Sequence, residues 1–298
     1  MSVVVCTRDR SALLARCLES LRAQDYGNLE ILVVDNGSSD DTAAVAREHP
    51  VHYVFEGRPG VSHARNRGIE ASTGEFVGFV DDDEEAGPDW ASRMVEAFAL
   101  GDRVAAAGGP VVPVYEVEPP AWLPRGFWES GGAGPAVEPT GPYVFNRVFG
   151  TGCSMFRRRH LGELRFRTDL GRKGDSLLSG EDTELVGRLL AGGWETAHVP
   201  RAPVRHFVPR ERIAFRWLLK RALAEGETEF RCRGPGVLWR RAHKLPVDLL
   251  RVLLALFTFD RGTIAARAVR FAQTSGIFYG AITGSLGAAA DHARRGGS

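Results

Sequence analysis

The sequence predicts an α/β fold, with a mostly parallel sheet flanked by helices, followed by a helical C-terminal region. Three observations support this prediction. β-branched stretches alternate with amphipathic stretches over roughly the first eighty residues. Polar clusters follow the expected strands, and the chain beyond residue 210 combines a helical pattern with many basic and apolar residues. We therefore expect one domain over residues 1–210 and a helical region over residues 211–298.

The first half of the chain predicts alternating strands and helices. The elements expected in order are a strand at 2–6, a helix at 11–24, a strand at 30–35, a helix at 40–49, a strand at 51–56, a helix at 61–72 and a strand at 75–81. Ser11 is the expected N-cap of the first helix. One face of that helix is expected to hold Leu13, Leu14, Cys17, Leu18 and Leu21. Because each helix joins two successive strands, the strands should be parallel and covered on both faces.

The second half is less regular. Residues 113–143 contain seven prolines, which predicts a long irregular loop. Residues 144–158 return to a strand-like pattern, and residues 179–194 form an amphipathic pattern that ends at two glycines, as a helix does. Residues 196–208 are expected to form a broken strand at the edge of the sheet.

Composition excludes several classes of protein. The 298 residues are 44% hydrophobic and 25% charged, which is typical of a globular chain and not of a disordered one. The four cysteines are scattered without a CxxC pair, which argues against a zinc site and a disulfide framework and is typical of a reducing compartment. The N-terminal stretch MSVVVCTRDR does not have the pattern of a signal peptide. We therefore expect a cytoplasmic protein.

Charge is divided unevenly along the chain. Residues 201–298 contain 18 Lys and Arg against 7 Asp and Glu, whereas residues 1–200 contain 20 against 30. The basic residues Arg216, Lys220, Arg221, Arg240, Arg241 and Lys244 are interleaved with Phe215, Trp217, Leu218 and Trp239. This pattern predicts a region that lies on an anionic membrane surface. The alternatives are a helical appendage packed on the first domain or on a second subunit of an oligomer. No nucleic-acid motif accompanies the charge.

A run of five carboxylates follows the strand expected at 75–81. Asp81, Asp82, Asp83, Glu84 and Glu85 are consecutive, and each negative charge makes the next harder to ionise. Three carboxylates at a strand end can bind Mg²⁺ or Mn²⁺ together with phosphate oxygens. The alternative is a solvated acidic turn. The position of this run at a strand end favours metal binding over a solvated turn, because ligands of parallel sheets bind beyond the carboxyl ends of the strands.

Other polar residues could complete such a site. Asp35, Asn36 and Ser38 can form a sharp turn after the second strand, which leaves the Asp35 carboxylate to accept hydrogen bonds from a base or ribose. Glu181 and Asp182 begin a helix, where its dipole favours ionised carboxylates and could keep one as a base. Each pattern also has a purely structural explanation, as a turn or a helix start. A histidine such as His206 is usually structural but could bind a metal.

Five segments in order resemble the family-2 glycosyltransferases, a family with the GT-A fold. The similar segments are VVVCTRDRSALLARCLESL, EILVVDNGSSDDT, GVSHARNRGIEASTGEFVGFVDDD, GTGCSMFRRRHL and LGRKGDSLLSGEDTELVGRLLAGGW, and the resemblance extends over residues 2–245. It implies a Rossmann-like nucleotide-sugar-binding domain. It also implies an inverting, metal-dependent transfer of sugar from a nucleoside diphosphate, with UDP favoured, to an acceptor hydroxyl in cell-surface glycan or glycolipid synthesis.

The resemblance assigns roles to residues. It implies that the nucleotide sugar is bound by Thr7, Arg8, Asp9, Asp35, Asn36, Ser38, Arg65, Asp81 and Asp82. It implies a divalent metal, Mn²⁺ or Mg²⁺, on Asp83, Asp81 and His206. Asp182 is the expected base, with Glu181 as its support or as an acceptor ligand. Independently of the resemblance, the irregular segment 113–143 is expected to order when ligands bind, so that Trp122, Phe127 or Trp128 contacts the acceptor or covers the donor.

Two segments depart from the family pattern, and other functions compete. CTRDR replaces the commoner opening, which bears on the nucleotide contacts of Arg8, and Cys153 stands where small polar residues are common.

The alternative functions are a transferase acting on a small secondary metabolite, a nucleotidyltransferase, or a non-catalytic sugar-nucleotide-binding protein. CTRDRSALL contains no glycine, which argues against the nucleotidyltransferase.

Overall fold

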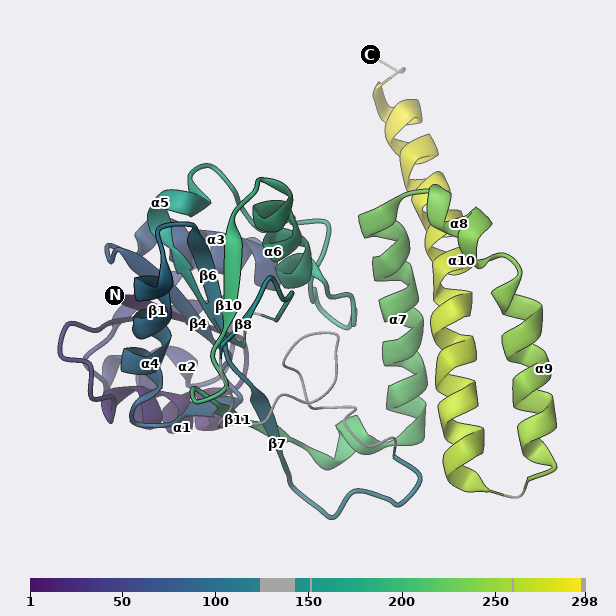
Figure 1. Cartoon of the computed structure of the whole chain (residues 1–298), viewed down its shortest axis with the longest axis horizontal. Coiled ribbons are helices and arrows are strands. Elements are labelled where there is room, and N and C mark those ends of the chain that lie inside the picture. The colour runs from purple at the N-terminus through teal and green to yellow at the C-terminus, as the bar shows by residue number, and fades with distance from the viewer. Residues whose placement is uncertain (124–142, 151, 259, 296–298) are drawn as a thin grey trace. The chain divides into compact units, whose positions relative to one another are not determined.

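A computed structural model of the chain describes residues 1–123, 143–150, 152–258 and 260–295 (Figure 1). The described residues fall into two compact units. The first comprises most of the chain up to Val208, and the second comprises Val117–Arg125, Asp175–Gly180 and Pro209–Ser298.

The first unit is built on an eight-stranded sheet in the order β3-β2-β1-β4-β9-β6-β10-β8. Its strands are β1 (Ser2–Thr7), β2 (Glu30–Asp35), β3 (His52–Phe55), β4 (Phe76–Val80), β6 (Val104–Gly108), β8 (Val144–Phe145), β9 (Cys153–Arg157) and β10 (Glu195–His198). β1 to β4 are mutually parallel, whereas β9 lies antiparallel between β4 and β6. The predicted α/β fold with a mostly parallel sheet is confirmed.

Helices cover both faces of this sheet. The helices of the first unit are α1 (Ser11–Arg22), α2 (Thr42–Arg47), α3 (Val61–Ala71), α4 (Trp90–Glu96), the 3₁₀ helix η1 (Ala97–Leu100), α5 (Arg158–Leu161) and α6 (Glu181–Ala191). Val3 and Val5 face a core built with α1 and α4, whereas Val4 faces a second core built with α3 and α6. The alternation along β1 therefore follows the period of two of a strand.

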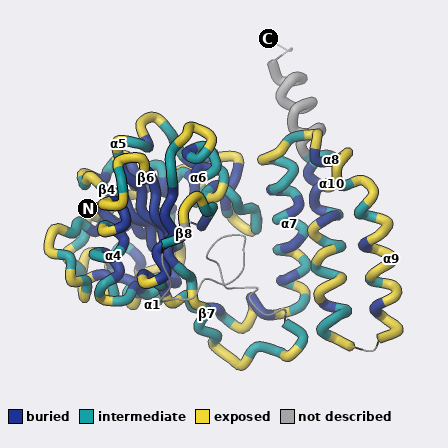
Figure 2. Tube along the Cα trace, viewed as in Figure 1, coloured by how far each residue is buried: buried dark blue, intermediate teal, exposed yellow. Residues whose placement is uncertain are grey.

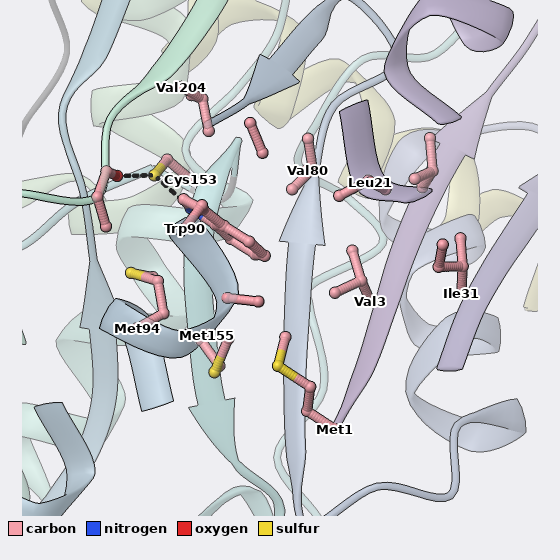
Figure 3. Close-up of a cluster of buried hydrophobic side chains, with 14 of the residues drawn as sticks. Met1, Val3, Leu21, Ile31, Val80, Trp90, Met94, Cys153, Met155 and Val204 are labelled. Atoms are coloured by element: carbon pink, nitrogen blue, oxygen red, sulfur yellow. Dashed lines mark hydrogen bonds between the residues drawn. The ribbon is translucent and has the colours of Figure 1, made fainter. Parts of the chain in front are cut away.

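Trp90 and Cys153 meet in the first core (Figure 3). Trp90 Nε1 donates to Cys153 Sγ at 3.2 Å, and this thiol donates to the Ala202 carbonyl at 3.2 Å. Burial raises the pKa of Cys153 to about 12, so the thiol stays neutral. Cys153 thus packs inside the domain, where its hydrogen bonds go to protein groups.

A smaller sheet contains β5 (Glu84–Ala86), β11 (Val204–Val208) and β7 (Val111–Tyr115), in the order β5-β11-β7. The prediction of one broken edge strand over 196–208 is wrong. β10 lies between β6 and β8, and β11 is the central strand of the smaller sheet. Both segments gain partners from far along the chain, which local sequence cannot show.

Two further expectations need correction. Residues 113–115 belong to β7, so the irregular segment begins later than predicted. Ser11 is the first residue of α1 and not its N-cap: Arg10 occupies the N-cap position without a side-chain cap. The Ser11 N–H donates instead to Asp40 Oδ2 at 2.9 Å, so a residue from the next connection satisfies this helix start.

The second unit is helical. It contains the 3₁₀ helix η2 (Arg210–Ile213), α7 (Phe215–Arg233), α8 (Gly236–Arg241), α9 (Lys244–Leu256) and α10 (Arg261–Arg295). α10 packs on α7 and on α9 (Figure 1). A Cβ at Gly226 would lie 1.9 Å from the Gln273 carbonyl, and one at Gly276 would lie 1.9 Å from the Leu223 carbonyl. Glycine at both positions lets the α7 and α10 backbones approach closely.

Candidate functional site

The carboxyl ends of three parallel strands form one edge of the large sheet. β1 lies between β2 and β4, and the register pairs Thr7 with Asp35 at the ends of β1 and β2. Asp81 follows the last residue of β4. The polar clusters after these strands therefore lie together, as the strand order predicts.

The acidic run after β4 is largely buried. Thr7 Oγ1 donates to Asp82 Oδ2 at 2.8 Å, and Arg10 Nη1 donates to Asp82 Oδ1 at 2.9 Å and to Asp83 Oδ2 at 3.0 Å. Burial raises the pKa of Asp82 to about 6; the Arg10 charge opposes this shift and the Asp83 charge adds to it. Because Asp82, Asp83 and Glu84 are all buried, the alternative of a solvated acidic turn is wrong for them.

The sequence predicted no role for Arg10 or for Glu84, although Glu84 belongs to the acidic run. The signal for Arg10 was a cation in the loop after the first strand, at the same sheet edge as the acids. Glu84 Oε2 accepts the Asp81 N–H at 3.1 Å, and a Cβ at Gly152 would lie 2.3 Å from Glu84 Oε1. Burial, then the Asp81 and Asp83 charges, raise the pKa of Glu84 well above its ordinary value. Glu84 therefore positions the turn, and only its burial reveals this role.

Arg65 on α3 connects the acidic run to α6. Its Nη2 donates to Asp81 Oδ1 at 2.9 Å, and its Nη1 donates to Glu181 Oε1. Burial acts to lower the pKa of Arg65, but the charges of Asp81 and Glu181 raise it by more. The net shift of this pKa is upward, so the guanidinium stays charged. This side chain holds together two predicted groups that are about a hundred residues apart in sequence.

Glu181 and Asp182 form the first turn of α6. Burial, then the Asp182 charge, raise the pKa of Glu181, and Arg65 opposes this shift. Glu181 Oε2 is buried and has no hydrogen-bond partner among the described residues, which is costly unless a ligand supplies one. Asp182 Oδ1 accepts the Thr183 N–H at 2.6 Å, and a Cβ at Gly150 would lie 3.1 Å from Asp182 Oδ2. Glycine at 150 thus avoids crowding this oxygen.

β11 brings His206 beside the acidic run. His206 pairs with Glu84 across the antiparallel β5 and β11, and its Nε2 lies 3.6 Å from Asp83 Oδ1. A metal that also binds phosphate oxygens needs only one or two protein ligands. Asp83 and His206 therefore fit a divalent metal. Within the described ranges, no group of three or more His, Cys, Asp or Glu is placed for a metal, so Asp81 as a further ligand stays a prediction.

The predicted nucleoside side is braced by its own polar groups. Asp35 Oδ1 accepts the Ser38 N–H at 2.8 Å, and Asp35 Oδ2 accepts the Tyr53 hydroxyl at 2.7 Å. The Asn36 amide donates to the Glu56 carbonyl at 2.9 Å and to the Arg58 carbonyl at 2.8 Å. Both amide hydrogens of Asn36 are therefore used inside the protein, which shapes the loop around Asp35.

Asp9 lies in the adjoining loop with φ 53°, in the left-handed region that aspartate tolerates better than most residues. Its N–H donates to Ser38 Oγ at 3.0 Å, and its Oδ1 accepts the Ser39 N–H at 2.6 Å. Arg8 Nε lies 3.5 Å from Asp9 Oδ2. These bonds connect the loops after β1 and β2, so Arg8, Asp9 and Ser38 form one surface cluster.

The aromatic residues predicted to cover the site are only partly described. Trp122 belongs to the second unit, where its ring packs edge to face on Phe215 with centroids 5.7 Å apart. Phe127 and Trp128 lie outside the described residues. The role proposed for these aromatic residues stays a prediction.

The family model described as glycosyl transferase family 2 matches residues 2–165. The chain is 30% identical to the succinoglycan biosynthesis protein ExoM of Rhizobium meliloti, over 96% of this chain and 93% of that protein. It is 28% identical to a glucosyl-dolichyl phosphate glucuronosyltransferase of Haloferax volcanii, over 88% of this chain and 85% of that protein.

Two solved structures share the fold. One is the mannosyltransferase PcManGT of Pyrobaculum calidifontis in complex with GDP-mannose and Mn²⁺, with a TM-score of 0.58 and 22% identity over 91% of this chain and 85% of that one. The other is residues 1–349 of Staphylococcus aureus TarS in complex with UDP, with a TM-score of 0.50 and 17% identity over 92% of this chain and 90% of that one.

Proposed function

The chain belongs to glycosyl transferase family 2 and is a glycosyltransferase with a GT-A-type fold, and we propose that it moves a sugar from a nucleoside-diphosphate sugar to an acceptor hydroxyl with inversion. The observation that carries the proposal is the buried Arg65, which holds the acidic run and the start of α6 in one site through Asp81 and Glu181.

The proposed reaction is one displacement. The acceptor oxygen forms a bond to the anomeric carbon while the bond from that carbon to the diphosphate oxygen breaks. Asp182 takes the proton of the hydroxyl, because a base is needed on the face opposite the leaving group. Glu181 supports Asp182 or binds the acceptor substrate. In the second case its buried Oε2 would accept a hydrogen bond from that substrate.

The departing diphosphate needs positive charge near it. Asp83 and His206 would hold Mn²⁺ or Mg²⁺, which neutralises charge on the diphosphate when bound. Arg65 adds a fixed positive charge. We further propose that Asp81 and Asp82 complete the phosphate side, and that Thr7, Arg8, Asp9, Asp35, Asn36 and Ser38 form the nucleoside side.

We propose a UDP-sugar as donor, with GDP-mannose as the alternative to test, because similar structures carry UDP or GDP-mannose. The acceptor is proposed to be a hydroxyl of a cell-surface glycan or of its lipid-linked precursor. The name of the Rhizobium relative, a protein of succinoglycan biosynthesis, favours this over a small secondary metabolite. We propose that the protein works on the cytoplasmic side of the membrane.

A donor panel tests the function. The thermal unfolding midpoint is measured with UDP-glucose, UDP-glucuronic acid and GDP-mannose, each with and without Mn²⁺. The correct donor should raise the midpoint only when Mn²⁺ is present, since a ligand that binds the folded state stabilises it. Slow release of UDP or GDP from that donor should accompany the shift. No shift with any nucleoside-diphosphate sugar would refute the proposal.

A further inference from the structure

Much of α9 is exposed (Figure 2), and many of its exposed residues are large and apolar. Its inward side is marked by the buried Asp248 and Ala255, and Asp248 Oδ2 accepts the Thr274 hydroxyl of α10 at 2.8 Å. The exposed large apolar residues of α9 and of its C-terminal end are Val247, Leu249, Leu250, Leu253, Leu254, Leu256 and Phe257. At 3.6 residues per turn they span roughly half of the helix circumference.

Such a surface needs an occupant. Leu254 is 57% exposed and Phe257 is 79% exposed, so these side chains are not the edges of a packed core. A contiguous apolar patch of this kind marks an interaction site on a soluble protein. Among the described residues no helix is long and apolar enough to cross a membrane.

A basic cavity of about 410 Å³ lies beside this surface. The charged residues that line it are Arg241, Lys244, Arg251, Arg270, Glu229 and Asp248. Arg241 pairs with Glu229 at 2.9 Å and Arg251 with Asp248 at 3.3 Å.

Lys244 and Arg270 carry the unbalanced charge of this cavity. Neither has an ion-pair partner within the part of the chain that the structure describes. The cavity therefore has two cations available for an anionic group.

The surface differs from the one that the sequence suggested. Leu218 is fully buried, and Arg221 is held by Glu225 at 3.1 Å and by the Leu177 carbonyl at 2.8 Å. Trp239 on α8 is 87% exposed and precedes Arg240 in the sequence. A tryptophan, basic side chains and an apolar helix face together are typical of a helix that lies in a lipid headgroup layer.

We propose that α9 and the adjoining cavity form a docking site for an anionic phospholipid membrane. The apolar face of α9 enters the boundary between headgroups and acyl chains, and Lys244 and Arg270 bind a lipid phosphate. Charge favours this occupant over a second copy of the chain, because pairing two α9 surfaces would bring the unpaired cations of two copies together. The inference uses only the second unit and does not depend on the proposed transfer reaction.

Vesicle flotation tests this docking site at low salt. The full chain is mixed with vesicles of phosphatidylcholine alone or of phosphatidylcholine with phosphatidylglycerol. Leu250→Gln with Leu254→Gln should lower binding to both by about tenfold or more, because each leucine loses the free energy of leaving water. Leu100→Gln, at a residue 45% exposed in the first unit, is the matched control and should bind normally.

A second pair of variants tests the cavity. Lys244→Glu with Arg270→Glu should reduce binding to the phosphatidylglycerol vesicles by about tenfold or more, because two cations near an anionic surface become anions. Binding to phosphatidylcholine should change little. Arg22→Glu on α1 is a control for charge reversal outside the second unit and should bind normally. Circular dichroism and the thermal midpoint of each variant establish that it is folded.

Several outcomes would overturn the proposal. These are no binding to either vesicle, or equal binding by the wild type and the leucine variant. If the charge variant binds the phosphatidylglycerol vesicles as well as the wild type does, the proposed phosphate contact is refuted. In a different outcome, the wild type sediments as a dimer and does not bind vesicles, while the leucine variant sediments as a monomer. That result would assign α9 to a protein interface. Donor-dependent thermal shifts measured in parallel report on the first unit, so failure of the transferase proposal is seen separately.

Discussion

Replacing Arg65 by methionine should destabilise the protein by about 3 kcal/mol, because it leaves a buried carboxylate without its cation. The side chains of Arg65 and Glu181 are only 6% and 7% exposed. Asp81 is 38% exposed, so solvent screens its pair with Arg65 and that pair contributes at most about 1 kcal/mol. Most of the loss should therefore come from Glu181.

The assay is urea unfolding followed by circular dichroism, in a double-mutant cycle. Adding Glu181→Gln to Arg65→Met should restore about 2 kcal/mol, because the second change removes the unpaired charge. Arg67→Met is the control, since Arg67 makes only an exposed pair with Glu70 at 3.6 Å on the same helix. It should cost less than about 0.5 kcal/mol.

The loss should also depend on pH. Burial already raises the pKa of Glu181, and removing Arg65 raises it further. A carboxyl whose pKa is raised on folding contributes stability that is present at low pH and is lost as pH rises through the folded pKa. The deficit of Arg65→Met should therefore be smaller near pH 5 than near pH 8. A deficit below about 1 kcal/mol, or equal unfolding of the single and double variants, would refute this reasoning.

Four further results are expected. Asp83→Asn should abolish the part of donor stabilisation that depends on Mn²⁺ in thermal shift assays; unchanged metal dependence would remove Asp83 from the metal site. Asp182→Asn should lower kcat by about 10² or more while donor affinity is kept, and near-normal turnover would assign the base elsewhere. His198 is fully buried, and burial lowers its pKa to about 4. The free energy of unfolding of the wild type should therefore fall by about 3 kcal/mol as pH falls from the unfolded-state pKa of about 6.5 through the folded-state pKa. His198→Leu should lose less stability over the same range, as measured by urea unfolding at each pH. Gly276→Ala should destabilise the helical unit by about 1–3 kcal/mol, since its Cβ would lie 1.9 Å from the Leu223 carbonyl; an unchanged thermal midpoint would contradict that packing.

The sequence by itself determined the α/β architecture and the site edge. The short apolar run of β1 predicts a strand that is buried on both faces, and the helical period in α1 records which of its faces is buried. Asp35 and Asp81 end or follow parallel strands, so alternating elements were enough to place them at one edge. Local sequence carries this information because a short apolar run is typical of a buried strand, and the period of an amphipathic helix marks the side that faces the core.

Only the tertiary structure decided which distant residues meet and how strongly their environment acts on them. The contact of Arg65 with Glu181 spans 116 positions, and β11 reaches Asp83 only because it pairs with β5. Burial, which raises the pKa of Asp82, and the unpartnered face of α9 also depend on how elements pack. These properties arise from strand order, register and desolvation, and none of the three is a property of a local stretch of sequence.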